Sequence, residues 1–183
     1  MMNQKSYLEK LKNQINKNCC LNITDTFFTI LFDMFLKIIV TYLDTAKKLA
    51  KHSDRNTILL KDIHLAQDFI DNEIIIISTE INCDKYSQLK NNYPKDDTNN
   101  FEYVGGKKLT KELEKYFTSK EFKALCTNYL PKNINIDTRA SNNMLETITE
   151  FLDGFMNQCK KHCDTKKSDT LSHDDAYYLI AKS

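Results

Sequence analysis

Turn-forming residues are scarce in this chain of 183 residues, which contains only three Gly and two Pro. An all-β fold or a doubly wound parallel sheet needs more of these residues at its turns, so the composition disfavours both. Hydrophobic residues make up 41% and charged residues 28% of the chain, which is typical of a globular protein. We therefore expect a mostly α-helical protein with one ordinary domain or two very small ones.

Long apolar runs are also missing from the sequence. No run reaches the roughly 18–20 residues that a membrane span needs. The first ten residues, MMNQKSYLEK, lack the apolar core of a signal peptide. We expect an intracellular protein that is neither secreted nor bound to a membrane, with its six Cys reduced.

An excess of positive charge is lacking as well, because the formal net charge is only +1 and each half of the chain is close to neutral. This balance differs from the bulk basicity of most proteins that bind nucleic acids. Arg occurs only as Arg55 and Arg139, and the other basic residues counted with it are Lys. Any contact with DNA must therefore come from local placement of charge.

Signatures of catalysis and metal binding are not visible either. We find no Ser-His-Asp arrangement, phosphate-binding loop or Gly-rich motif, and the acidic residues are scattered along helices. The sequence CKKHC places Cys159, His162 and Cys163 on one helix, but no partner motif supplies a fourth zinc ligand. Core packing is the better interpretation of these residues. We expect no enzymatic activity, no metal and no cofactor.

Helical periodicity divides most of the chain into two units of the same design, each with a long helix between two short ones. The expected helices are 6–17, 25–52 and 60–71 in the first unit, and 119–130, 139–166 and 172–181 in the second. Ser6 is expected to cap the first helix, and Thr24 or Asp25 the second. Each long helix is apolar over too wide a face for one neighbour, so the two units should cover each other.

The segment between the units has weaker patterns. Its apolar run Ile74–Ile77 fits a strand or a buried helix, and we favour a helix that extends the first unit. Pro94–Gly106 has the turn formers of a linker, and Leu109–Phe117 has the pattern of an extra helix. The predicted organisation is a first domain at 1–93, a linker at 94–106 and a second domain at 107–183.

The stretch RNTILLKDIHLAQDFI follows the long helix of the first unit. Its Arg55, Thr57 and Asp62 have the spacing found in the second loop and third helix of core histones. The order of short helix, loop, long helix, loop and short helix also resembles the histone fold. This resemblance implies an obligate dimer of two such units, whose long helices cross head to tail.

The second unit resembles the histone fold more loosely. Thr170 and Asp175 keep the spacing of the motif, but Ser168 stands where the Arg would be. Two such units in one polypeptide resemble the histone doublets of large DNA viruses. The resemblance implies an all-α, intramolecular head-to-tail dimer that binds double-stranded DNA without sequence specificity and compacts it in nucleosome-like particles. The implied location is a nucleus, a viral factory or a virion.

The resemblance also implies where DNA would be contacted. In a histone dimer, the first loop of one fold lies beside the second loop of the other, and the paired loops grip the DNA backbone while Arg side chains enter the minor groove. The two arginines would then share one end of the dimer, and a third site is expected where the N-termini of the two first helices converge. The candidate DNA-binding residues are Arg55, Thr57, Arg139, Lys17, Lys166, Lys167, Lys120 and Lys5; Ser6, Thr118 and Ser119 are further candidates at the third site.

Other interpretations of these residues stay open. Arg55 also fits a structural role as the ion-pair partner of Asp62, and Arg139 fits a solvated position near a helix start. The near-neutral charge predicts weaker DNA binding than that of a typical histone. The alternative is a histone-fold interaction module of a transcription or packaging complex, and a capsid-associated or linker-type component is a third possibility.

Association with other doublets, or with a second copy of the chain, is the expected route to larger particles. The surface for this contact would lie at the end of a long helix and on the following short helix, near His52, Asp62, Cys163 and Asp175. We expect no membrane and no small-molecule substrate among the partners.

Overall fold

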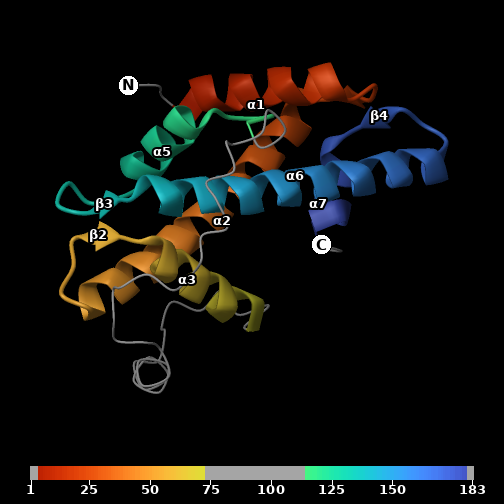
Figure 1. The fold of residues 1–183 in the computed structure, drawn as a ribbon. Helices are drawn as coiled ribbons and strands as arrows, with labels where there is room; N and C mark the ends of the chain where they lie inside the picture. Colours follow the sequence, from red (N-terminus) through yellow and green to blue (C-terminus); the bar gives the residue numbers. More distant parts are fainter. Residues whose placement is uncertain (1–3, 73–113, 181–183) are drawn as a thin grey trace.

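The computed structural model describes residues 4–72 and 114–180, which are mostly helical, as predicted (Figure 1). The helices are α1 (Gln4–Asn18), α2 (Asp25–His52), α3 (Leu60–Asn72), α5 (Ser119–Asn128), α6 (Thr138–Lys166) and α7 (His173–Ile180). The strands have two residues each and are β1 (Asn22–Ile23), β2 (Thr57–Ile58), β3 (Asn135–Ile136) and β4 (Thr170–Leu171).

The two long helices begin where a side chain caps them. The Thr24 hydroxyl accepts a hydrogen bond from the Phe27 amide, and α2 has the bounds that the sequence predicts. In α6, the Asp137 carboxylate accepts from the Arg139 amide at 2.9 Å. This cap starts α6 at Thr138, one residue before the predicted position.

Two local predictions are wrong. Helix α1 already begins at Gln4, so Ser6 lies within the helix and does not cap it. The end of the predicted helix Leu109–Phe117 is not helical, because residues 114–117 form a turn that buries Tyr116 and Phe117 side by side. The rest of that helix, the apolar segment 74–77 and the predicted linker 94–106 lie outside the described residues.

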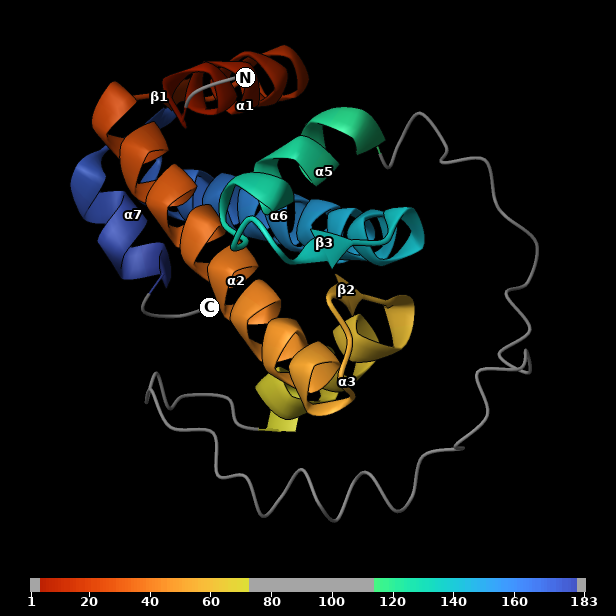
Figure 2. The same cartoon turned by 90° about the vertical axis from the view of Figure 1, so that its left-hand side faces the viewer.

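The strands pair between the units and not within them. β1 pairs in parallel with β4, and β2 pairs in parallel with β3. Because β1 precedes α2 and β4 follows α6, the start of α2 lies beside the end of α6, and β2 with β3 repeats this arrangement at the other end. The long helices therefore cross head to tail, as Figures 1 and 2 show.

Helix α2 is covered on several sides, as its wide apolar face predicts. It packs against α1 and α3 of its own unit and against α5 and α7 of the other. Aromatic rings join the units: Phe27 lies 6.3 Å from Phe155, and Phe35 stacks on Phe117 at 5.4 Å between ring centroids. The buried side chains form one hydrophobic cluster to which both units contribute.

By length and composition, α2 is long and apolar enough to cross a membrane. A search for uninterrupted apolar runs does not detect this property. Asp33 and Lys37 interrupt the apolar run, but a window along the helix averages over them. Half of that window is buried inside the protein, and the core helix of a soluble protein has the same properties. This feature is therefore weak evidence for a membrane.

Candidate nucleic-acid interface

The β2–β3 pair forms one end of the described part of the protein. The Asn135 amide donates to the Asn56 carbonyl at 2.8 Å, and the Asp137 amide donates to the Ile58 carbonyl at 2.9 Å. These bonds hold the loop between α2 and α3 against the loop between α5 and α6. Since Arg55 lies shortly before β2, and the N-terminus of α6 follows β3, the two arginines of the chain share this end of the structure.

The Arg55 side chain is committed to a buried clamp within the first unit. Its guanidinium donates to both carboxylate oxygens of Asp62, at 2.7 and 2.8 Å, and to the Thr57 carbonyl at 2.9 Å. The same carboxylate accepts from the Leu59 amide at 2.8 Å. The Asp62 side chain is 3% exposed and that of Arg55 is 21% exposed. This geometry favours the structural interpretation of Arg55, and Thr57 contributes its backbone to the clamp.

Arg139 has a different environment, because its side chain is 66% exposed. The Asp137 carboxylate lies 3.5 Å from Nε of Arg139, and an exposed pair of this kind constrains a side chain weakly. Lys51 and Lys132 are also exposed on the segments that lead into this end, although the sequence did not single them out. Asp54 is exposed there too, so the surface carries mixed charge with an excess of cations.

The β1–β4 pair forms the opposite end. The Asn22 amide donates to the Asp169 carbonyl at 2.8 Å, and the Thr24 amide donates to the Leu171 carbonyl at 3.1 Å. Lys17 and Lys167 are exposed close to these strands, as a contact with phosphate would require. The exposed carboxylates of Asp164 and Asp169 lie on the same segments, so this end is close to neutral.

Lys166 belongs to a second clamp, which corresponds in position to that of Arg55. Asp175 accepts from Lys166 Nζ at 2.6 Å, from the Ser172 amide and hydroxyl at 2.8 and 2.9 Å, and pairs with His162 Nε2 at 2.7 Å. Burial by itself would raise the pKa of Asp175, but the hydrogen bonds from Lys166, Ser172 and His162 outweigh it and hold that pKa well below its usual range. Lys and His thus occupy the place that Arg55 has in the first unit.

The lowered pKa of Asp175 predicts a pH-dependent contribution to stability. A carboxylate with a depressed folded pKa stabilises fully above its unfolded pKa of about 4, and the contribution is lost as the pH falls through the folded value. We expect Asp175→Asn to lower the free energy of unfolding by about 2–3 kcal/mol at neutral pH. The loss should shrink below about pH 4 when wild type and variant are compared by urea unfolding.

The matched control for this measurement is Asp174→Asn, in the same turn. The Asp174 side chain is 87% exposed and pairs with the exposed His173 ring. Its replacement should change stability by no more than about 0.5 kcal/mol across the same pH range. A loss in Asp175→Asn that stayed constant down to pH 2 would contradict an ionised, hydrogen-bonded Asp175.

The predicted convergence of the first helices' N-termini is wrong. At its start, α1 contacts the end of α5, where the side-chain amide Nε2 of Gln4 donates to the Tyr129 hydroxyl at 2.7 Å. Further along α1, Lys10 forms an ion pair with Glu121 in the first turn of α5. The two helices therefore run in opposite directions across each other, and their N-termini lie apart.

The N-terminus of α5 is also occupied by carboxylates of the chain itself. Glu121 accepts from the Thr118 amide at 2.9 Å, and Glu114 accepts from the Ser119 amide at 2.8 Å. Two donors that a phosphate would use are thus taken, and negative charge already lies there. Lys120 is exposed beside these groups. Because the N-terminus of α1 lies apart, Lys120 cannot share a phosphate site with it.

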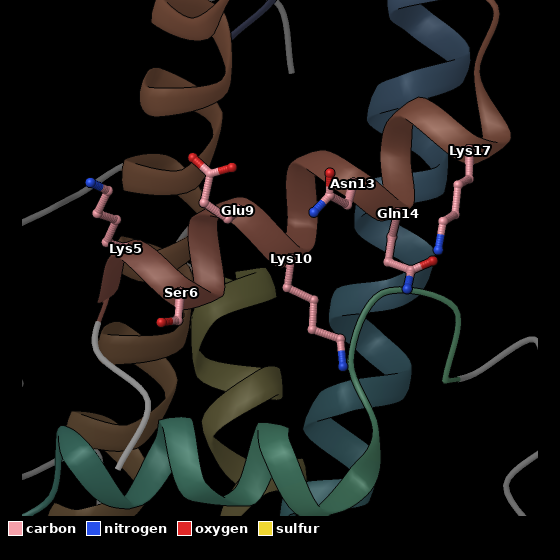
Figure 3. Close-up of a pocket in the computed structure, with 7 residues that line it drawn as sticks. All are labelled: Lys5, Ser6, Glu9, Lys10, Asn13, Gln14 and Lys17. Atoms are coloured by element: carbon pink, nitrogen blue, oxygen red, sulfur yellow. The ribbon is translucent and has the colours of Figure 1, made fainter.

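Lys5 lies on an open, polar hollow along α1 (Figure 3). The hollow is lined by Lys5, Ser6, Glu9, Lys10, Asn13, Gln14 and Lys17. Lys5 and Glu9 extend on one side of the helix, whereas Lys10 points toward α5, where it meets Glu121. The hollow therefore offers scattered, partly neutralised charge rather than a defined anion site.

Most of the residues expected at a surface for larger assemblies are buried. Asp62 and Asp175 are held in the two clamps, and Cys163 is buried in the core, so these three cannot contact another molecule. The fourth residue, His52, is exposed at the end of α2.

Two tyrosines are the exposed large hydrophobic residues of the described chain. Tyr177 is 60% and Tyr178 is 47% exposed, and both lie on α7. Consecutive helical residues point about 100° apart, so with Ala176 and Leu179 facing inward both tyrosines must turn outward. That geometry is the signal by which they could have been predicted.

The CKKHC sequence does not assemble a metal site. Cys159 and Cys163 are buried, whereas His162 turns to Asp175. Between residues 4–72 and 114–180, no group of three His, Cys, Asp or Glu side chains is placed to hold a metal ion.

Comparison with known proteins adds no family to this description, because no protein-family model matches the chain and no curated protein is significantly similar to it. We therefore infer its function from the geometry and charge of the two loop pairs.

Proposed function

We propose that this protein is an intramolecular pair of histone folds that binds double-stranded DNA without sequence specificity and compacts it. The observation that carries the proposal is the double pairing of loops, β1 with β4 and β2 with β3, on long helices that cross head to tail. This arrangement puts a loop of each unit at either end of the molecule. Paired loops of this kind can follow a DNA backbone through main-chain donors and cations without reading bases.

The contacts with phosphate come from exposed cations beside the paired loops. Arg139, Lys51 and Lys132 serve at the β2–β3 end, and Lys17 and Lys167 serve at the β1–β4 end. Exposed carboxylates lie among them, so few phosphates are neutralised, and both the affinity and its dependence on salt are smaller than those of a strongly basic protein. Binding to DNA is therefore expected to be weaker than that of a typical, strongly basic histone.

Arg55 and Lys166 act in this proposal as positioning residues. Arg55 lies in the loop between α2 and α3, and Lys166 is the last residue of α6. Each is bonded to an Asp on the following helix, Asp62 or Asp175, and so fixes the shape of the loop that leads to that helix. Loss of either side chain weakens DNA binding through the fold rather than through a lost phosphate contact.

A salt titration with a matched pair of double variants tests the proposal. Arg139→Ala with Lys132→Ala removes two cations from the β2–β3 end, and Lys37→Ala with Lys160→Ala removes two exposed cations from the middle and late turns of the long helices. We expect the loop variant to make the negative slope of log K against log salt shallower by about 2. Fluorescence anisotropy on a duplex of random sequence measures this slope.

The control variant has the same net charge, so it should keep nearly the wild-type slope. Equal weakening by both variants would indicate attraction by bulk charge and contradict a site at the loops. A folded, helical wild-type protein that failed to bind at about 50 mM salt would overturn DNA binding altogether.

The second candidate function is a histone-fold module whose main partners are proteins. The exposed Tyr177 and Tyr178 favour it, because tyrosines are enriched in protein interfaces. Asp164, Asp169 and Asp174 are also exposed on α6, α7 and the segment between them, which disfavours DNA at that surface. Absence of DNA binding, together with weaker capture of a protein partner by Tyr177→Ser, would support this candidate.

A further inference from the structure

The two loop pairs share one pattern of backbone hydrogen bonds, so their side chains can be compared position by position. At one end, the Asn135 amide donates to the Asn56 carbonyl at 2.8 Å. At the other end, the Asn22 amide donates to the Asp169 carbonyl, also at 2.8 Å. Asn56 of the β2–β3 end therefore corresponds to Asp169 of the β1–β4 end.

The C-termini of the two long helices extend this correspondence. Asp54 follows α2 with a φ of 53°, and Lys167 follows α6 with a φ of 54°. The Asp54 amide donates to the Lys51 carbonyl at 2.9 Å, and the Lys167 amide donates to the Asp164 carbonyl at 3.3 Å. Lys51 at the end of α2 therefore corresponds to Asp164 at the end of α6.

The N-termini of the long helices complete the comparison. The Asp137 amide, before α6, donates to a carbonyl of β2 at 2.9 Å, and the Thr24 amide, before α2, donates to a carbonyl of β4 at 3.1 Å. Arg139 lies two residues after Asp137, and Thr26 lies two residues after Thr24. The exposed arginine of the β2–β3 end thus corresponds to a threonine at the other end.

Three of these matched positions make the β2–β3 end the more positive one. Lys51 is an exposed cation where the other end has the exposed carboxylate of Asp164. Arg139 has a neutral counterpart, and the neutral Asn56 stands where the other end has Asp169. A polyanion therefore meets cations and an amide at one end and carboxylates at the same places of the other.

Two matched positions act in the opposite direction. Asp54 stands where the other end has Lys167, and Asp137 stands where it has a threonine. The Asp137 carboxylate is turned back to cap α6. The exposed Lys132, shortly before β3, adds another cation, so the β2–β3 end keeps its excess of positive charge.

The β1–β4 end also uses a neutral donor within the protein. The side-chain amide of Asn22 donates to the Asp169 carboxylate at 3.2 Å. This donor is therefore occupied, and the carboxylate that occupies it repels a phosphate. In place of Asp169, the β2–β3 end has the exposed Asn56, whose side-chain amide can donate to a phosphate oxygen.

We propose that the β2–β3 end is the principal DNA-binding surface of this protein and that the β1–β4 end adds little to binding. The inference rests on the proposed function, because it assigns most of the DNA contacts to one of the two loop pairs. Lys51, Lys132 and Arg139 neutralise phosphates, whereas Asp164 and Asp169 hold the DNA backbone away. At the β1–β4 end, the strand pairing serves mainly to join the two units.

Lysine labelling of the full-length wild-type protein locates the contact directly. The protein is treated with a small amount of acetic anhydride at low salt, with and without a duplex of random sequence, and mass spectrometry compares the acetylation of each lysine. We expect the duplex to lower the labelling of Lys51 and Lys132 about fivefold or more, and that of Lys17 and Lys167 less than about twofold. Equal or greater protection of Lys17 and Lys167 would overturn the inference.

Charge variants at matched positions test the cause of the asymmetry. Lys51→Asp with Asn56→Asp gives the β2–β3 end the carboxylates of the other end. Lys37→Asp with Asn157→Asp makes the same change in net charge at exposed positions along the long helices. By fluorescence anisotropy at about 50 mM salt, the loop variant should weaken binding about tenfold more than this control does.

The reverse exchange should create a second binding surface. Asp164→Lys with Asp169→Asn should strengthen binding, and the duplex should then protect Lys17 and Lys167 as strongly as it protects Lys51. Equal weakening by the loop variant and its control would overturn the inference while leaving DNA binding in place. Wild-type protein that did not bind the duplex would overturn the inference and the proposed function together.

Discussion

Replacing Asp62 by Asn should lower the free energy of unfolding by about 3–5 kcal/mol, because it breaks a buried ion pair and leaves its cation behind. The Asp62 carboxylate is buried and accepts from Arg55 and from the Leu59 amide. The Asn side chain has nearly the same size as Asp. It has only one acceptor oxygen, whereas the donors of Arg55 and Leu59 bond to both carboxylate oxygens of Asp62. Urea unfolding followed by circular dichroism at neutral pH measures the loss.

Two companion variants test the mechanism. Asp33→Asn makes the same change at an exposed position of α2 and should stay within about 0.5 kcal/mol of wild type. Arg55→Gln removes the other half of the clamp, and its combination with Asp62→Asn should cost clearly less than the sum of the single losses. Strictly additive losses would contradict direct coupling of the two side chains.

Much of the helical frame could be predicted because it depends on local chemistry. The apolar positions of α2 recur with helical periodicity, and Thr24 caps it, so both bounds of this helix were predictable. The turn at residues 114–117 was not, because Tyr116 and Phe117 continue the helical spacing of Leu109 and Leu113 in the sequence. Their burial against other elements, which no local pattern specifies, decided the conformation.

The candidate site was predictable only in outline. The spacing of Arg55 and Asp62 left open whether the arginine binds DNA or the carboxylate, and this was decided by two hydrogen bonds across a loop. The opposite directions of α1 and α5 follow from pairs such as Lys10 with Glu121, which are far apart in sequence. A resemblance of helix order does not specify such contacts.

The two clamps also take one basic side chain of each unit away from a partner. Arg55 is neutralised by Asp62, and Lys166 by Asp175, so these cations hold loops in place rather than face a polyanion. Arg139 is the arginine that stays mostly exposed. If DNA is the partner, most of the salt dependence should therefore come from Arg139 and exposed lysines.

Replacing Phe117 by Ala should cost about 3–5 kcal/mol of stability, which matches the expected loss at Asp62 but acts through packing. Phe117 is fully buried, with its ring stacked on Phe35 at 5.4 Å and 6.1 Å from Tyr7. It thus joins the segment before α5 to both α1 and α2. Truncation leaves a cavity lined by two aromatic rings that cannot fully close.

Urea unfolding of Phe117→Ala also tests whether the two units form one cooperative structure. Because the ring lies between them, the variant should unfold in one transition with an unchanged slope and a lower midpoint. The control is Tyr177→Ala, which removes an exposed aromatic side chain and should change the midpoint little. A second transition in Phe117→Ala, or a loss below about 1 kcal/mol, would mean that each unit folds without the other's core.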